Sequence, residues 1–218
     1  ILLVLEPLGV GLEFTRGEGP RIARPVRSEE DVSRLAPVDV PSSVGFVFET
    51  VRLVCKALAD RVPLVGFAGA PFTLASYLIE GGASREFLET KRFMRAEPAA
   101  WHALMARLAG ITAEYLNGQI DAGAQAVQLF DSWVGTLSPA DYREFVLPHS
   151  RAVLSRLTPG VPTIHFGTGT ATLLELMKDN ERAWVKVSGP ERVSTTGAPF
   201  HDAIPFMQGL AAAAPDRF

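Results

Sequence analysis

Apolar residues form two patterns along the chain, which are short runs and longer segments with helical spacing. The run at 62–67 is unbroken, the runs at 126–130, 162–166 and 184–187 are largely apolar, and a further apolar run covers 1–5. An apolar run of this length is typical of a strand that is buried on both faces, as in a parallel sheet. We therefore predict four strands and a possible fifth at the start of the sequence.

Between these runs, apolar residues recur every three or four positions, which predicts helices. Ser28 and Ser138 each open a capping box, in which a serine hydroxyl satisfies a free amide of the first turn. Pro98 suits the first position of the longest predicted helix, and Ser43 and Ser84 are expected to cap two others. The remaining predicted helices cover 71–80, 171–177 and 202–214.

Strands that alternate with helices indicate parallel βα units. Their spacing suggests part of a (β/α)8 barrel, and a complete barrel needs about 250 residues and eight strands. Since the chain has 218 residues, we predict the α/β class and a single domain, a partial (β/α)8 TIM barrel truncated at both ends. Residues 15–27, where glycines and prolines stand among charges, are predicted to form a surface loop.

The composition narrows the class of protein. Hydrophobic residues make up 47% of the chain, and 21 basic residues stand against 24 acidic ones, for a net charge of −3. This balance argues against a disordered chain and against a nucleic-acid binder, which needs a basic face. The longest uncharged run, 62–79, contains two prolines and two glycines, so it is a poor membrane helix. The single cysteine, Cys55, fits a reduced, cytoplasmic setting, and no histidine spacing indicates a metal site.

Candidate chemistry lies where the predicted strands end, because the site of a parallel barrel is at the carboxyl ends of its strands. Gly69 permits either close approach of a ligand to the backbone or a tight turn that packing requires. Asp131 is placed to accept protons or bind a cationic group, or else to cap the loop backbone. Ser132 can donate to a carboxylate, and His165 is either a ligand or a packing residue.

Two long motifs resemble a known family. They are GFAGAPFTLASYLIEGG at 66–82 and AGAQAVQLFDS at 122–132, and shorter matches stand at 6–14 and 161–166. In this order they resemble uroporphyrinogen decarboxylases, from residue 1 to about 177. The resemblance implies a (β/α)8 barrel, usually a homodimer, that uses no metal and no cofactor. It implies removal of the carboxyl groups of the four acetate side chains of uroporphyrinogen, which gives coproporphyrinogen in heme biosynthesis.

The resemblance also implies site residues. Tyr77 and Ser132 take the positions of polar catalytic and substrate-binding residues, with Tyr77 expected near the reacting acetate and Ser132 on a substrate carboxylate. Phe67 and Phe130 fall on aromatic positions that line the cleft, and Gly69 falls on a close approach of the backbone to substrate. The family's arginine-rich motif, its central aspartate and its late histidine have no counterpart in these 218 residues.

Residues 180–218 carry a different resemblance, to the 2-pyrone-4,6-dicarboxylate hydrolases of the amidohydrolase superfamily. We therefore expect a chimera, with a decarboxylase-like part at 1–177 and a hydrolase-like tail at 178–218. Three alternatives remain. They are a dicarboxylate lactone hydrolase, a related methyltransferase that would need a zinc-binding His/Cys set, and a non-catalytic fragment that associates with another chain to close the barrel.

Overall fold

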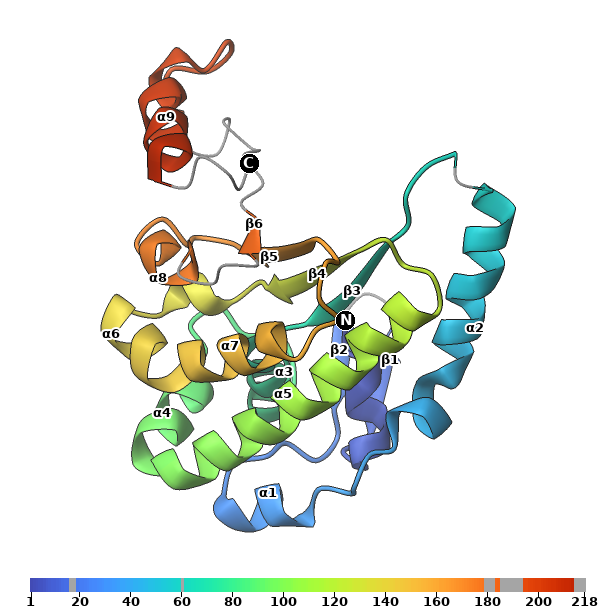
Figure 1. Ribbon diagram of the computed structural model, residues 1–218. Coiled ribbons are helices and arrows are strands. Elements are labelled where there is room, and N and C mark those ends of the chain that lie inside the picture. Colours follow the sequence, from blue (N-terminus) through green and yellow to red (C-terminus); the bar gives the residue numbers. More distant parts are fainter. Residues whose placement is uncertain (16–18, 60, 179–182, 185–193, 214–218) are drawn as a thin grey trace.

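A parallel sheet forms the centre of the molecule (Figure 1). The computed structural model describes residues 1–15, 19–59, 61–178, 183–184 and 194–213. Within them the sheet has the order β3-β4-β5-β6, and all three of its strand pairs are parallel. The strands are β3 (Val65–Gly69), β4 (Ala126–Asp131), β5 (Thr163–Gly167) and β6 (Ala183–Trp184). The described strands do not close, so the prediction of a partial (β/α)8 barrel is confirmed.

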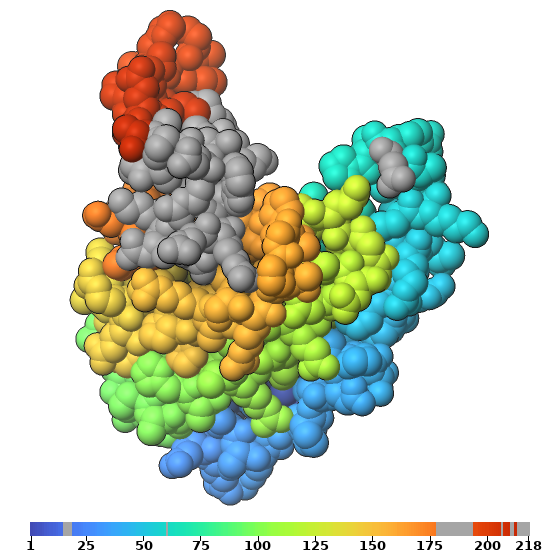
Figure 2. All heavy atoms as spheres, viewed as in Figure 1, coloured from blue at the N-terminus to red at the C-terminus, as the bar shows by residue number. Residues whose placement is uncertain are grey.

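Helices connect the strands. Those described are α1 (Glu29–Arg34), α2 (Val40–Leu58), α3 (Pro71–Glu80), α4 (Leu88–Ala96), α5 (Pro98–Asp121), α6 (Pro139–Asp141), α7 (Leu147–Ser155), α8 (Leu174–Lys178) and α9 (Ile204–Ala213). The described 3₁₀ helices are η1 (Leu3–Leu8), η2 (Val134–Thr136) and η5 (His201–Ala203), and η3 (Tyr142–Val146) is a π-helix. In the space-filling view, α4 to α7 (green to yellow) and the blue N-terminal segment pack into one continuous surface (Figure 2).

The helix α5 is the centre of the helical layer, since it contacts α2, α3, α4, α7 and strand β3. Its Trp101 is fully buried and contacts the rings of Phe72 and Phe93. The predicted start at Pro98 is confirmed, as are the capping boxes of Ser28 and Ser138. Each of these serine hydroxyls accepts the backbone N–H of the residue three positions later.

The prediction of a strand over residues 1–5 is wrong, because this segment enters the 3₁₀ helix η1. Leu2, Leu5 and Leu8 are all buried, and their spacing of three matches the three-residue turn of a 3₁₀ helix. The turn ends at Gly9, which adopts a left-handed conformation with φ of 79°.

The prediction of a loop over 15–27 is also partly wrong. Residues Leu12–Thr15 form β1 and pair antiparallel with β2 (Gly19–Ile22). This two-stranded sheet has no further strand among the described residues, so Pro20 lies on an edge, where a missing N–H is tolerated. The backbone N–H of Ile22 donates to the carbonyl of Gly81 at the end of α3, which attaches the hairpin to the main body.

Two predicted caps are displaced. Helix α2 begins three residues before Ser43, with Asp39 as its N-cap, since the Asp39 carboxylate accepts the N–H of Ser42 and a proline is compatible with the first turn. The Ser84 hydroxyl accepts the N–H of Phe87, which is one residue ahead of α4.

The predicted C-terminal elements are only partly described. Residue 184 ends β6, while residues 185–187 of the predicted strand lie outside the described residues, as does much of the predicted tail. The predicted helix at 202–214 is confirmed over α9. Among the helices that the structure describes, none is long and apolar enough to cross a membrane.

Candidate active site

The two faces of the sheet differ in chemistry. Along β4, Val127, Leu129 and Asp131 are buried, and the residues between them are only partly buried. Since alternate side chains of a strand point to opposite faces, the buried set faces the helical layer, where α3 and α5 contact the strands. The other face carries Phe130, so the two predicted site positions at the end of this strand, 130 and 131, point in opposite directions.

Phenylalanines gather on that second face. The rings of Phe67 and Phe130 meet edge to face at 5.9 Å, and the rings of Phe130 and Phe166 lie 5.2 Å apart. Phe67 is 46% exposed and Phe166 is 37% exposed, so the rings form an open apolar surface rather than a sealed core. The structure thus brings the predicted Phe67 and Phe130 together and adds Phe166, which follows from the pairing of Phe130 with Phe166 in the strand register.

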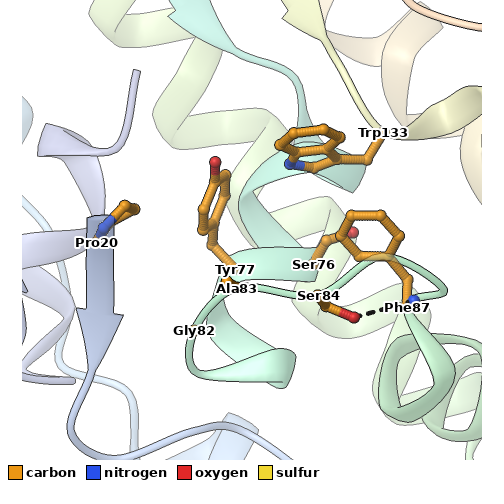
Figure 3. Close-up of a pocket in the computed structure, with 8 residues that line it drawn as sticks. All are labelled: Pro20, Ser76, Tyr77, Gly82, Ala83, Ser84, Phe87 and Trp133. Carbon is orange, nitrogen blue, oxygen red and sulfur yellow. Dashed lines mark hydrogen bonds between the residues drawn. The ribbon is translucent and has the colours of Figure 1, made fainter. Parts of the chain in front are cut away.

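A pocket of about 190 Å³ lies beside this edge of the sheet (Figure 3). Its lining residues are Pro20, Ser76, Tyr77, Gly82, Ala83, Ser84, Phe87 and Trp133. Three aromatic rings of the lining contact one another, since the ring of Trp133 lies 6.1 Å from that of Tyr77 and 5.4 Å from that of Phe87. The β1–β2 hairpin contributes Pro20 opposite them, so segments far apart in the sequence enclose one cavity.

The Tyr77 phenol is the polar group of this pocket that sequence analysis selected. It is carried by α3 and is half-buried, and its burial raises the pKa of the phenol, an effect that the Trp133 side chain partly offsets. In Figure 3 the indole nitrogen of Trp133 lies on the side of Tyr77. At neutral pH the phenol therefore keeps its proton and can donate a hydrogen bond to a ligand carboxylate.

Ser132 lies at the end of β4, directly before Trp133. The Thr168 hydroxyl of the segment after β5 donates to the Ser132 carbonyl. The same segment approaches Gly135 so closely that a Cβ there would lie 2.1 Å from the Thr168 carbonyl oxygen. The loop after β5 therefore holds the loop after β4, although Ser132 is not among the residues that line the pocket.

Gly69 is closely packed by its own chain. A Cβ at this position would lie 2.8 Å from Ile1 Cγ2 and 2.8 Å from Leu74 Cδ2. The Thr112 hydroxyl donates to the Gly69 carbonyl at 3.3 Å. These contacts account for the glycine by packing, and its approach to substrate stays a prediction.

Asp131 and His165 point away from the pocket and the phenylalanine face. His165 Nε2 lies 3.3 Å from Asp131 Oδ2, and their side chains are 3% and 0% exposed. The Thr73 hydroxyl donates to Asp131 Oδ1 at 3.4 Å. The Asp131 carboxylate therefore neither faces solvent nor caps the loop backbone through a described hydrogen bond, because its described partners are side chains from α3 and β5.

Sequence analysis gave Trp133 no role in the site and missed Phe87 altogether. The signal for Trp133 was its place directly after Ser132 at the end of a predicted strand. Phe87 gave no signal of its own, since its position depends on how the turn before α4 folds back. Within the described residues, no group of three or more His, Cys, Asp or Glu side chains is placed to hold a metal ion.

Comparison with known proteins shows the family of the chain. The family model of uroporphyrinogen decarboxylase (URO-D) matches residues 1–197. The uroporphyrinogen decarboxylase of Carboxydothermus hydrogenoformans is 51% identical over 178 residues, which are 81% of this chain and 51% of that protein. The protein of that name from Sorangium cellulosum is 52% identical over 180 residues, 82% of this chain and 52% of its own length.

A solved structure shows the same fold at lower identity. A methyltransferase from Methanosarcina mazei superposes with a TM-score of 0.68 at 20% identity, over 88% of this chain and 57% of that one. The chain spans about half the length of the curated relatives it matches. On the evidence of the family match and of these identities, the chain belongs to the uroporphyrinogen decarboxylase family.

Proposed function

We propose that this chain forms part of the substrate cleft of a uroporphyrinogen decarboxylase, which converts the four acetate side chains of uroporphyrinogen to methyl groups. The observation that carries the proposal is the identity of 51–53% over about 180 residues to proteins of that name. The aligned part includes both long motifs, and these motifs hold the pocket residues Tyr77 and Ser76 and the strand end at Ser132.

The proposed chemistry needs no bound cofactor. Protonation of the electron-rich pyrrole lets the ring accept the electrons of the bond between the acetate methylene and its carboxylate, and carbon dioxide leaves. The methylene then takes a proton to become a methyl group, and the proton first added to the ring leaves, which restores the pyrrole, so that one proton is consumed for each carbon dioxide released. The protein has to supply a placed acid, anchors for carboxylates and an apolar cleft that excludes water.

The described residues fit these last two tasks. The protonated phenol of Tyr77 is suited to donate to the acetate carboxylate, and the Ser132 hydroxyl is suited to hold a second carboxylate. The face formed by Phe67, Phe130 and Phe166 offers an apolar surface to the tetrapyrrole ring. Because a carboxylate in an apolar surrounding is poorly solvated, this face also favours loss of carbon dioxide over retention of the charge.

The test is the binding and turnover of acetate-bearing tetrapyrroles by the 218-residue chain. Turnover is measured under anaerobic conditions, by chromatography of the porphyrins obtained after oxidation. Binding is measured with uroporphyrin, which carries acetates, and with coproporphyrin, which carries methyl groups in their place. Binding is measured beside turnover because the resemblance assigns further catalytic residues to positions outside these 218 residues.

We expect uroporphyrin to bind more tightly than coproporphyrin, and Tyr77→Phe and Ser132→Ala each to lower this preference about tenfold, the value of one hydrogen bond to a charged group. Tyr115→Phe is the matched control, since Tyr115 is a buried residue of α5 that contacts the ring of Phe48 on α2 and does not line the pocket. Equal binding of both porphyrins, together with no decarboxylation, would overturn the proposal.

We also infer a homodimer in the cytoplasm, and a boundary at about residue 177 between the decarboxylase-like part and the tail. The proposal is supported by the relatives, which align over 178–180 of the 218 residues, although the family match continues to residue 197. Light scattering tests the dimer. A continuous read of the coding DNA across residues 171–180 tests whether the two parts are joined.

A further inference from the structure

Asp131 joins three elements behind the proposed site. Its two carboxylate oxygens contact Thr73 Oγ1 on α3 and His165 Nε2 on β5, at 3.4 Å and 3.3 Å. Asp131 itself is the last residue of β4. In the strand register Leu129 pairs with His165, so Asp131 and His165 are diagonal neighbours on the same face of the sheet.

Each of these elements carries a residue of the proposed site. Thr73 is one helical turn before Tyr77 on α3, so fixing Thr73 fixes the height of the phenol relative to the sheet. Ser132 follows Asp131 directly. The segment after β5 holds Ser132 a second time, through the hydroxyl of Thr168.

The burial of the Asp131 carboxylate limits the hydrogen-bond partners that it can have. The Asp131 side chain is fully buried, and a buried carboxylate is costly unless it is paired and hydrogen-bonded. Losing the contact with His165 would leave Thr73 as the described hydrogen-bond partner of the carboxylate, and it would remove the described partner of His165 Nε2, while Nδ1 of the same buried ring has none among the described residues. The three-way contact therefore selects one arrangement of α3, β4 and β5 over arrangements shifted by a fraction of a turn.

We propose that Asp131, with Thr73 and His165, is a positioning residue that sets the Tyr77 hydroxyl and Ser132 at the spacing needed to hold two carboxylates of the substrate. The proposal rests on the proposed function for the identity of the ligand. The positioning itself rests on the contacts of the described side chains. Asp131 touches no substrate, and it acts through the two residues that do.

The main variant is Asp131→Asn, which keeps the shape and removes the charge. Asp141→Asn is its matched control, because the Asp141 carboxylate accepts from the Ser138 hydroxyl and pairs with Arg95, and Asp141 is not among the residues that line the pocket. His165→Leu removes the imidazole partner of the Asp131 carboxylate, and His165→Gln supplies an amide N–H donor in place of the ring. Thr73→Val removes one contact alone, and it serves as the test if Asp131→Asn fails to fold.

Two measurements separate positioning from stability. The first is the ratio of the dissociation constants of coproporphyrin and uroporphyrin, because a loss of folded protein weakens both equally. The second is the ¹⁹F resonance of Trp133 in protein labelled with 5-fluorotryptophan. The chain has three tryptophans, and Trp133→Phe identifies the signal.

We expect Asp131→Asn to lower the ratio about tenfold and to shift the Trp133 resonance, and His165→Leu to do the same. His165→Gln should recover part of the ratio, and Asp141→Asn should change neither readout. A folded Asp131→Asn protein with an unchanged ratio and an unchanged resonance overturns the proposal. If the unsubstituted chain shows no preference for uroporphyrin, the proposed function fails, and the Trp133 resonance alone decides whether Asp131 positions the loop.

Discussion

The packing of α2 against α5 leads us to predict different effects on stability when alanine replaces two glycines of α5, Gly110 and Gly118. A Cβ at Gly118 would lie 2.3 Å from Cζ of Phe48, and 2.6 Å and 2.7 Å from its two Cε atoms. A Cβ at Gly110 would meet no atom closer than Arg156 Nη1, at 3.7 Å. Alanine at Gly110 therefore fits without movement, whereas alanine at Gly118 requires the ring to shift by about 1 Å to restore a carbon contact of about 3.5 Å.

The expected change in the free energy of unfolding is the sum of two opposing contributions. Replacing a helical glycine by alanine stabilises a helix by about 1 kcal/mol, and this gain applies at both positions. At Gly118 the gain is opposed by overpacking, which costs about 1–3 kcal/mol. The Phe48 ring is 7% exposed and contacts Tyr115, so it cannot move outward without losing buried area. We expect Gly110→Ala to be more stable than the parent chain, and Gly118→Ala to be about 1–3 kcal/mol less stable than Gly110→Ala.

The assay is urea unfolding followed by far-ultraviolet circular dichroism, with free energies compared only where the slopes agree. Both variants are repeated with Phe48→Leu, which removes the ring atoms that the new methyl group would meet. The gap between the two alanine variants should then shrink to a few tenths of a kcal/mol. Equal stability of the two variants in the presence of Phe48 would refute the packing that the structure shows between α2 and α5.

Three further predictions concern stability. Trp101→Phe should lower the free energy of unfolding by about 2–4 kcal/mol in the same urea assay, because it removes buried volume and the N–H that donates to the Phe145 carbonyl at 2.9 Å. Burial and then a neighbouring histidine lower the pKa of His149 to about 4, below its value of about 6.5 in an unfolded chain. The unfolded state therefore binds more protons between these pH values, so stability should fall as the pH drops from 6.5 towards 4, and His149→Phe should flatten the profile of urea midpoint against pH. The Asp202 carboxylate accepts hydrogen bonds from residues 194–196, so Asp202→Ala should speed amide exchange there and leave the urea midpoint unchanged.

The alternation of strands and helices was predictable because a buried parallel strand needs a short, largely apolar run. The runs at 126–130 and 162–166 are each within one residue of β4 and β5 at both ends. The same rule misled at residues 1–5, since a run of five apolar residues also suits a buried helical turn. A short apolar run indicates that a segment is buried, but its conformation depends on the elements that pack around it.

The hairpin of β1 and β2 shows a second limit. Each strand has four residues, and β2 contains a glycine and a proline, which lower strand propensity. Its stability depends on Ile22, which is buried and donates its N–H to the end of α3. Ile22 and Gly81 are far apart in the sequence, so no local pattern predicts their contact. For the same reason, Pro20 was not predicted to line the pocket.

The sequence pointed to the end of one strand as a candidate site, yet it did not predict the directions of the side chains there. The rule that barrel sites lie at strand ends selected Phe130, Asp131 and Ser132 together. A strand turns consecutive side chains to opposite faces, and the run at 126–130 has apolar residues on both faces, so the sequence does not show which face is buried. The structure resolves this, because burial alternates along β4 and places Asp131 against Thr73 and the helical layer. A carboxylate at a strand end is therefore as well suited to fixing the catalytic groups from behind as to touching the substrate, and only the register of the neighbouring strands distinguishes the two.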